Sequence, residues 1–188
     1  MVTISPLGFF TYTDPQTDIH LAQSRLIFME IKGMTYPNYQ QDLNIALESE
    51  ILGELIFLNA AKHSRSVDQQ HKWQILAQLE TQTLQKLQLF LKEQGRTASI
   101  RPHVKLQAIA SGIAMAKLPW KLAMRLLKQG TKPFMATFER MNQHADADTQ
   151  DFLKYLLAHE QALAEFATQE LNGNTTGSLA PVFALLKS

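Results

Sequence analysis

Three stretches of this sequence place a glutamate in the middle of an apolar helical face. The clearest is segment 69–94, in which five apolar residues lie within about 40° of Glu80 when each residue turns roughly 100° around a helix: Trp73, Leu76, Leu84, Leu87 and Leu91. Burying a lone ionised carboxylate costs several kcal/mol. A single glutamate on such a stripe more often lies at the rim of a core, but several that converge in one core need compensation.

Segment 147–171 repeats the pattern around Glu160. The apolar residues within about 40° of it, at the same helical step, are Leu153, Leu156, Ala164, Ala167 and Leu171. His159 lies about 100° away on that count, at the edge of the same face. The third stretch, 38–64, carries two acids, Glu50 and Glu54, among Leu43, Leu47, Phe57 and Ala61.

Three long helices that each aim a carboxylate at a common core predict a shared polar site. Compensation can come from a bound metal ion, from proton sharing with raised pKa values, or from buried basic partners. Carboxylate oxygens suit iron and manganese, and helix bundles build such sites from inward glutamates. The sequence leaves these three alternatives open.

The rest of the chain predicts shorter helices and turns, with no strand alternation. Between the long segments we expect three helices, separated by Pro119 and Gly130: 103–117, 120–129 and 133–145. We expect a single all-α domain made of an irregular N-terminal segment, a helical bundle and a C-terminal tail, covering 1–36, 37–171 and 172–188.

Composition excludes several classes of protein. The 188 residues include no cysteine, so disulfides, thiolate metal sites and a cysteine nucleophile are ruled out. No phosphate-binding glycine loop occurs. The first residues lack the pattern of a signal peptide, and no apolar run reaches the ~20 residues that span a bilayer. The expected location is the cytoplasm.

Charge is unevenly distributed despite a net charge of +1. The stretch 95–138 carries eight basic residues and no acid. Within it, segment 117–128 is a basic amphipathic helix that could meet a membrane or an acidic partner, although capping the bundle with its charges in water is the expected role. Nucleic-acid binding is not expected, because aromatic residues do not alternate with these charges.

Three motifs resemble helices one, two and four of the ferritin-like superfamily of carboxylate-bridged di-iron proteins: LGELIFLNAA, WQILAQLETQTLQKL and LLAHEQALAEF. The resemblance covers roughly 40–94 and 131–171. It implies a ferritin-like four-helix bundle with extra short helices in the crossover, which we place at 103–130. Carried over by position, Glu54 matches the first-helix ligand, Glu80 the second-helix ligand and Glu160 the fourth-helix ligand.

The chain departs from this family where the family has histidines. The two E-x-x-H motifs read Glu80-Thr-Gln-Thr83 and Glu160-Gln-Ala-Leu163, and Glu139 is expected to be exposed rather than to act as a third-helix ligand. Glu50 or His159 could complete the site. The remaining histidines show no ligand spacing and are expected at the surface: His63, His71, His103 and His144.

The resemblance implies iron or manganese and, if the chain is an enzyme, a metal-dependent oxidoreductase or oxygenase. The alternative is a non-catalytic bundle with a degenerate metal site that acts as a binding or structural module. A small apolar ligand is one expected partner, and a homodimer is left open. Four residues could line an apolar pocket, although plain core is the commoner role for such side chains: Met115, Phe134, Met135 and Phe138.

Overall fold

The computed structural model describes residues 2–4, 10–12, 36–93, 95 and 102–187, and the chain divides into two compact units, 1–35 and 36–188. In the first unit, strands β1 (Val2–Ile4) and β2 (Phe10–Tyr12) pair antiparallel. This pair differs from the irregular segment expected there, because three-residue runs carry too little alternation to be recognised. The other residues of this unit lie outside the described part of the chain.

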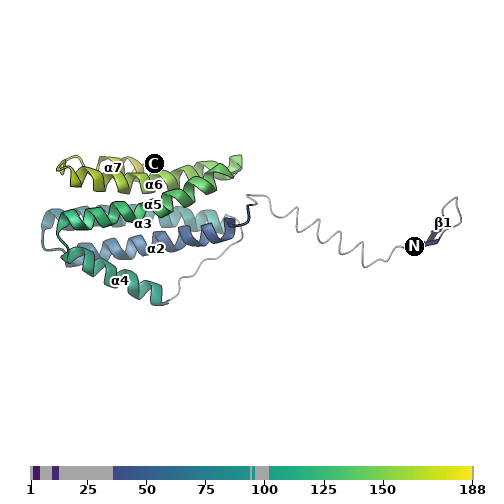
Figure 1. Cartoon of the computed structure of the whole chain (residues 1–188), viewed down its shortest axis with the longest axis horizontal. Coiled ribbons are helices and arrows are strands. Elements are labelled where there is room, and N and C mark those ends of the chain that lie inside the picture. The colour runs from purple at the N-terminus through teal and green to yellow at the C-terminus, as the bar shows by residue number, and fades with distance from the viewer. Residues whose placement is uncertain (1, 5–9, 13–35, 94, 96–101, 188) are drawn as a thin grey trace. The chain divides into compact units, whose positions relative to one another are not determined.

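In the second unit, the described residues form six helices and no strand (Figure 1), which confirms the all-α class for this unit. The helices are α2 (Tyr39–His63), α3 (Val67–Glu93), α4 (Pro102–Lys117), α5 (Trp120–Gln143), α6 (Ala147–Leu171) and α7 (Ala180–Leu186). None of the described helices is both long and apolar enough to cross a lipid bilayer.

Helix α5 corrects the prediction of two short helices, at 120–129 and 133–145. Gly130 and Pro133 both lie within one continuous helix. The apolar face continues through this region, from Met124 and Leu127 to Phe138, and its burial outweighs the hydrogen bond that the proline removes. The crossover expected at 103–130 therefore contains one separate helix, α4, and ends where α5 begins at Trp120. The C-terminal tail is also more ordered than expected, since it contains α7.

Four long helices surround the core of this unit. Helices α2 and α3 pack as one pair and α5 and α6 as another, while α2 also contacts α5 and α3 contacts α6. Within each pair, a three-residue turn joins the first helix to the second. Asp146 in the α5–α6 turn caps the start of α6, because its side chain accepts a hydrogen bond from the Thr149 amide at 2.9 Å. Helix α4 lies on α2, and α7 lies on α6 and α3.

A glycine allows α4 to approach α2 closely. A Cβ atom at Gly112 would collide with the carbonyl oxygen of Ile56 and would lie 2.8 Å from the Cβ of Asn59. The backbones of α2 and α4 are therefore nearly in contact at this crossing, and α4 packs closely on α2.

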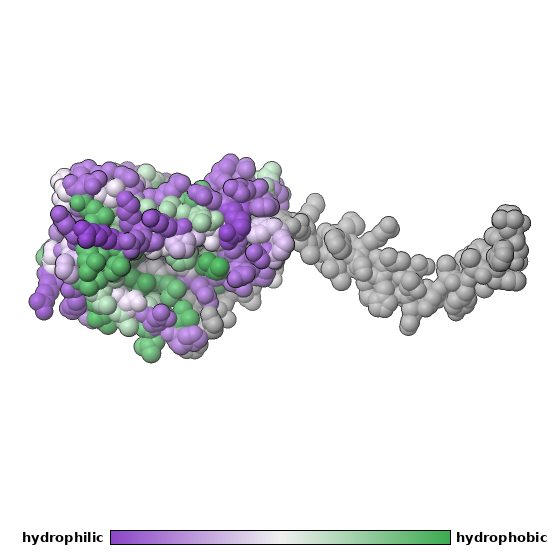
Figure 2. Space-filling view, in the orientation of Figure 1, coloured by the Kyte–Doolittle hydropathy of each residue, from purple (hydrophilic) through white to green (hydrophobic). Residues whose placement is uncertain are grey.

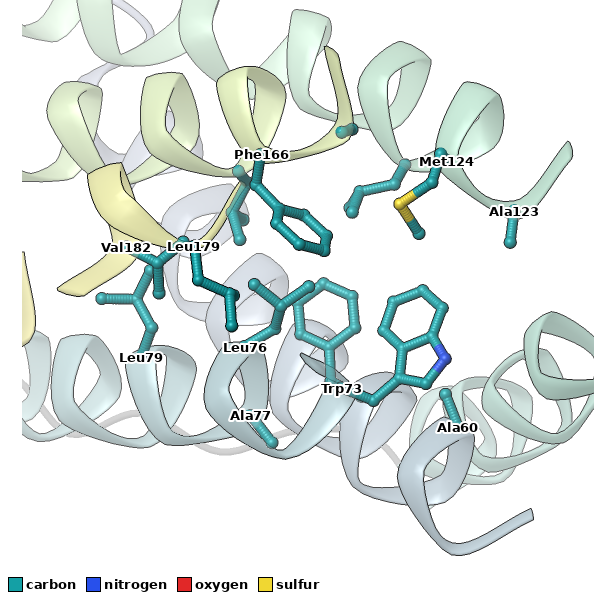
Figure 3. Close-up of a cluster of buried hydrophobic side chains, with 14 of the residues drawn as sticks. Ala60, Trp73, Leu76, Ala77, Leu79, Ala123, Met124, Phe166, Leu179 and Val182 are labelled. Atoms are coloured by element: carbon teal, nitrogen blue, oxygen red, sulfur yellow. The ribbon is translucent and has the colours of Figure 1, made fainter. Parts of the chain in front are cut away.

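A cluster of buried apolar side chains joins α2, α3, α5 and α6, and Leu179 and Val182 add to it from the start of α7 (Figure 3). The ring of Trp73 stacks on Phe57 with centroids 5.5 Å apart and meets Trp120 edge-on at 5.3 Å. Most residues of the predicted stripes are buried as expected, with Leu76, Leu153 and Leu156 fully inaccessible, whereas Ala164 and Leu171 are only partly buried.

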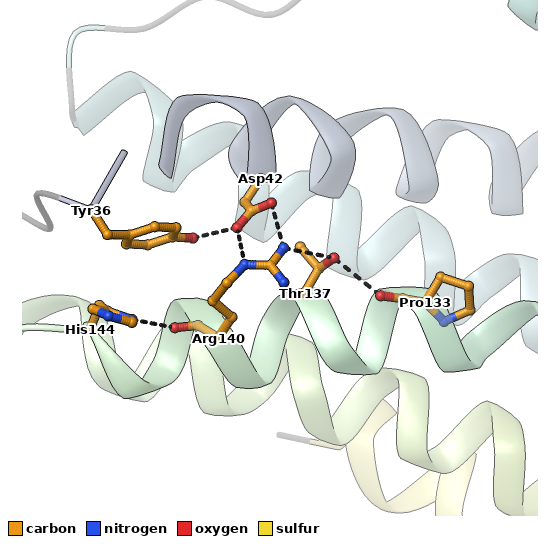
Figure 4. Close-up of polar contacts among 6 residues, drawn as sticks. All are labelled: Tyr36, Asp42, Pro133, Thr137, Arg140 and His144. Atoms are coloured by element: carbon orange, nitrogen blue, oxygen red, sulfur yellow. Dashed lines mark hydrogen bonds and ion pairs between the residues drawn. The ribbon is translucent and has the colours of Figure 1, made fainter. Parts of the chain in front are cut away.

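A charged pair ties the other end of α2 to α5 (Figure 4). The guanidinium of Arg140 donates two hydrogen bonds of 2.8 Å to the two carboxylate oxygens of Asp42, and the Tyr36 hydroxyl donates a third of 2.6 Å. Asp42 is buried, so these donors replace the water that its carboxylate loses on folding.

Candidate metal centre

Two of the long helices bring three ligand-type side chains together in the interior. Glu50 comes from α2, and His159 and Glu160 come from α6. One ligand atom of each lies within 4.8 Å of the others, and all three residues are buried. Among the described residues this is the group of His and acidic side chains with the spacing needed to hold a metal ion.

The imidazole of His159 lies between two carboxylates. Its Nδ1 is 3.7 Å from Glu50 Oε1, and its Nε2 is 3.5 Å from Glu80 Oε1. Both distances exceed those of good hydrogen bonds. Glu80 comes from α3 and is 2% exposed, so a third helix contributes a carboxylate to the same interior space.

Several polar atoms of this cluster have no hydrogen-bond partner. They are both carboxylate oxygens of Glu50 and both ring nitrogens of His159. Buried polar groups in folded proteins are nearly always satisfied, so such a group calls for an explanation such as a missing ion. A divalent cation fits these atoms, because it would accept the lone pairs of a carboxylate and of an imidazole at once.

Burial also shifts the titration of the three acids. Desolvation raises the pKa of Glu50 and of Glu160 well above the ordinary range, although the nearby His159 opposes the shift in both. Desolvation likewise raises the pKa of Glu80, to about 8, and the charge of Glu54 adds to this shift. Without a counter-charge, this interior therefore favours protonated carboxyl groups.

Glu54, the match to the family's first-helix ligand, is at the edge of the cluster. It is partly buried, and its Oε1 accepts a 2.6 Å hydrogen bond from the Thr81 hydroxyl. It is not part of the three-residue group. Glu50, one turn earlier on α2, occupies the interior position instead.

The positions where the family has histidines hold other groups here. The Thr83 hydroxyl is buried and lies 3.0 Å from the Tyr155 hydroxyl, and Leu163 is part of the apolar core. The imidazole of the site comes from His159, which precedes Glu160 instead of following it by three residues. The angular count places His159 at the edge of the apolar face around Glu160. In the structure His159 is fully in the interior, with 1% of its surface exposed.

Close to these acids is an apolar cavity of about 280 Å³. Carboxyl-bearing Glu80 and Glu160 line it together with apolar residues from α2, α4, α5 and α6, among them Phe57, Met115, Leu127, Phe134 and Leu163. Two of the four residues expected at a pocket, Met115 and Phe134, do line it. Phe138 is fully buried core, and Met135 is not part of the lining.

Other predicted residues lie away from this cluster. Glu139 is exposed, as expected, and so are His71, His103 and His144. On the basic helix, Leu122 and Leu126 are 40% and 44% exposed rather than directed into the core. Figure 2 shows apolar surface over α4 and the adjoining part of α5, beside hydrophilic side chains.

Comparison of the chain with protein-family models, with curated proteins and with solved structures finds no match.

Proposed function

We propose that this chain is a metal-binding protein of ferritin-like architecture, whose buried cluster holds one iron or manganese ion. The observation that carries the proposal is the set of unpartnered atoms on Glu50 and His159, both almost fully buried. Glu50, His159 and Glu160 would be the ligands, and Glu80 would complete the set from the third helix. Oxygen-rich ligands with a single imidazole favour these two metals.

The bound ion would supply redox chemistry with dioxygen or peroxide, and the protein residues would provide the surroundings. The four side chains that would hold the ion are buried, and an apolar substrate in the cavity would lie beside Glu80 and Glu160. This arrangement supports a metal-dependent oxidoreductase or oxygenase. The substrate lies on the α4–α5 side of the cluster, where the apolar walls are.

Elemental analysis tests this proposal. Protein made without a metal-binding affinity tag is expected to contain about one equivalent of iron or manganese, as for a closed site with preformed ligands. The Glu50→Ala, Glu160→Ala double variant should lose it. The matched control, Glu139→Ala with Glu165→Ala, removes two exposed acids from α5 and α6 and should retain it. Wild-type protein that stays metal-free after incubation with both ions contradicts the proposal.

A second candidate is favoured by the raised pKa values of the three acids. In that case the glutamates are protonated, no metal binds, and the bundle is a non-catalytic binding or structural module. The same double variant separates the two candidates. Removing buried acids without a metal should raise the melting temperature, because their desolvation is a cost, whereas removing ligands of a bound ion should lower it.

A further inference from the structure

Two glycines line the cavity, Gly53 and Gly130, and at Gly130 the place where a side chain would begin is open space. Gly130 lies inside α5 and lines the cavity, and a Cβ atom built there would meet no atom within 4 Å. Its neighbours therefore do not require a glycine, unlike those of Gly53 or Gly112. A glycine within a helix lowers stability by roughly 1 kcal/mol relative to alanine. At Gly130 the missing side chain leaves this part of the cavity lining open.

The volume of the cavity limits what it can hold. An apolar cavity of about 150 Å³ accommodates benzene. The present cavity, about 280 Å³, is nearly twice as large. It therefore suits a body of roughly ten to twelve carbon atoms on the same scale, such as two fused rings or a medium-length alkyl chain.

Charge defines the polar end of such a ligand. None of the residues that line the cavity is basic, so no lining side chain would pair with an anion beside Glu80 and Glu160. The charged residues within 102–138 of α4 and α5 are all basic; they lie outside the lining, and together they disfavour a cation on this side of the unit. An uncharged hydrogen-bonding end remains, such as a hydroxyl or a carbonyl group.

We propose that this cavity binds an uncharged small molecule with an apolar body of that size, which enters past Gly130 and directs its polar end toward Glu160 and Glu80. The inference builds on the proposed function, since it places the substrate of the same site. Its binding test nevertheless does not require a metal. The apolar walls provide the affinity, and the two acids provide the orientation.

Fluorescence titration with prodan, an uncharged naphthalene fluorophore, tests the site. Wild-type protein should bind the probe with blue-shifted emission, and decanol should displace it better than decanoate. Gly130→Leu places a side chain in open space and should weaken binding about tenfold or more. Should that variant not fold, Gly130→Ala should fold more stably than wild type and still bind more weakly.

The matched control is Gln129→Leu, which adds the same side chain at an exposed neighbouring position outside the cavity lining. It should bind prodan as wild type does. A folded Gly130→Leu protein with wild-type affinity overturns the inference, and so does an equal loss in Gln129→Leu. Displacement by decanoate as effective as by decanol overturns the uncharged ligand class.

The two proposals can fail separately. The Glu50→Ala, His159→Ala variant, which changes two residues outside the cavity lining, should lose its metal and keep its apolar site, whereas Gly130→Leu should keep its metal and lose prodan. Metal-free wild-type protein that binds prodan as described contradicts only the proposed function. Metal-loaded protein in which Gly130→Leu binds prodan normally contradicts only the ligand site.

Discussion

The carboxyl group of Glu80 lies in the space beside Gly53 that a side chain would otherwise fill. A Cβ atom at residue 53 would lie 2.6 Å from the carboxyl carbon of Glu80 and 2.6 Å from its Oε2. Any larger residue would require this carboxyl group to shift. Gly53 therefore makes room for the observed position of Glu80, although it resembles an ordinary interruption of the α2 sequence.

Replacing Gly53 by alanine should disturb the cluster and should stabilise the protein less than the same change at Gly130. The added methyl group forces the carboxyl end of Glu80 to shift, which offsets the roughly 1 kcal/mol that alanine gains over glycine in a helix. Gly130→Ala is the matched control, because it meets open space and should stabilise the protein by about 0.5–1 kcal/mol. Chemical denaturation of both variants measures the difference. Equal effects of the two substitutions would contradict the close approach of Glu80 to Gly53.

Stability of the metal-free protein should fall as the pH rises. The pKa of Glu80 increases from 4.5 to about 8 on folding, so between these values the native state binds more protons than the unfolded state. The free energy of unfolding then decreases with pH, by up to about 1.4 kcal/mol per pH unit for one group. Urea unfolding in a chelator at several pH values between 5 and 8 measures this slope, which Glu80→Gln should reduce.

For the pair of Asp42 and Arg140 we expect the opposite pH dependence, with stability lost as the pH falls. Burial would raise the pKa of Asp42, but hydrogen bonds from Arg140 and Tyr36 outweigh it and lower the pKa. The native state therefore binds fewer protons than the unfolded state near this pKa, and stability is lost as the pH falls below about 4. Asp42→Asn should flatten the acid limb of a plot of unfolding free energy against pH.

Removing Arg140 should destabilise the same contact at neutral pH. Arg140→Met leaves a buried carboxylate with the Tyr36 hydroxyl as its remaining side-chain donor, and we expect a loss of about 1–3 kcal/mol because the guanidinium itself is partly exposed. Arg140→Lys keeps the charge without the two-pronged geometry and should recover only part of this loss. Full recovery by lysine, measured by thermal unfolding, would show that the paired hydrogen bonds are unimportant.

The buried pair of Lys72 and Glu170 should contribute more to the stability of the fold than the pair of Asp42 and Arg140 does. Lys72 Nζ lies 2.9 Å from Glu170 Oε1, and the side chains are 5% and 0% exposed. The other Glu170 oxygen accepts a 2.7 Å hydrogen bond from Trp120 Nε1. Lys72→Met leaves this carboxylate without a counter-charge, so we expect a loss of about 3–5 kcal/mol.

Lys154 provides the control for that experiment. It is exposed and lies 4.0 Å from the exposed Asp151, so Lys154→Met should change stability by less than about 1 kcal/mol. Both variants remove one lysine and add one methionine. Comparable losses in urea unfolding would indicate that the Lys72 pair is not specially stabilising.

Periodicity predicted the long helices and the burial of Glu80 and Glu160, because a stripe of leucines fixes which side of a helix faces the core. It did not rank Glu50 above Glu54, since the two lie one turn apart and only the approach of neighbouring helices decides between them. The burial of His159 is underestimated for the same reason, because the angular count describes one helix at a time. The contact between Gly53 and Glu80 joins two helices, so no local pattern in the sequence predicts it.

Helix α5 is held at its two ends by contacts to different helices. Trp120 donates to Glu170 of α6, and Arg140 donates to Asp42 of α2. Between these anchors lie Gly130, which favours the helix least among ordinary residues, and Pro133, which has no amide hydrogen to donate. The residues of α5 that favour a helix least therefore lie next to the cavity, between two polar contacts that attach the same helix to α6 and to α2.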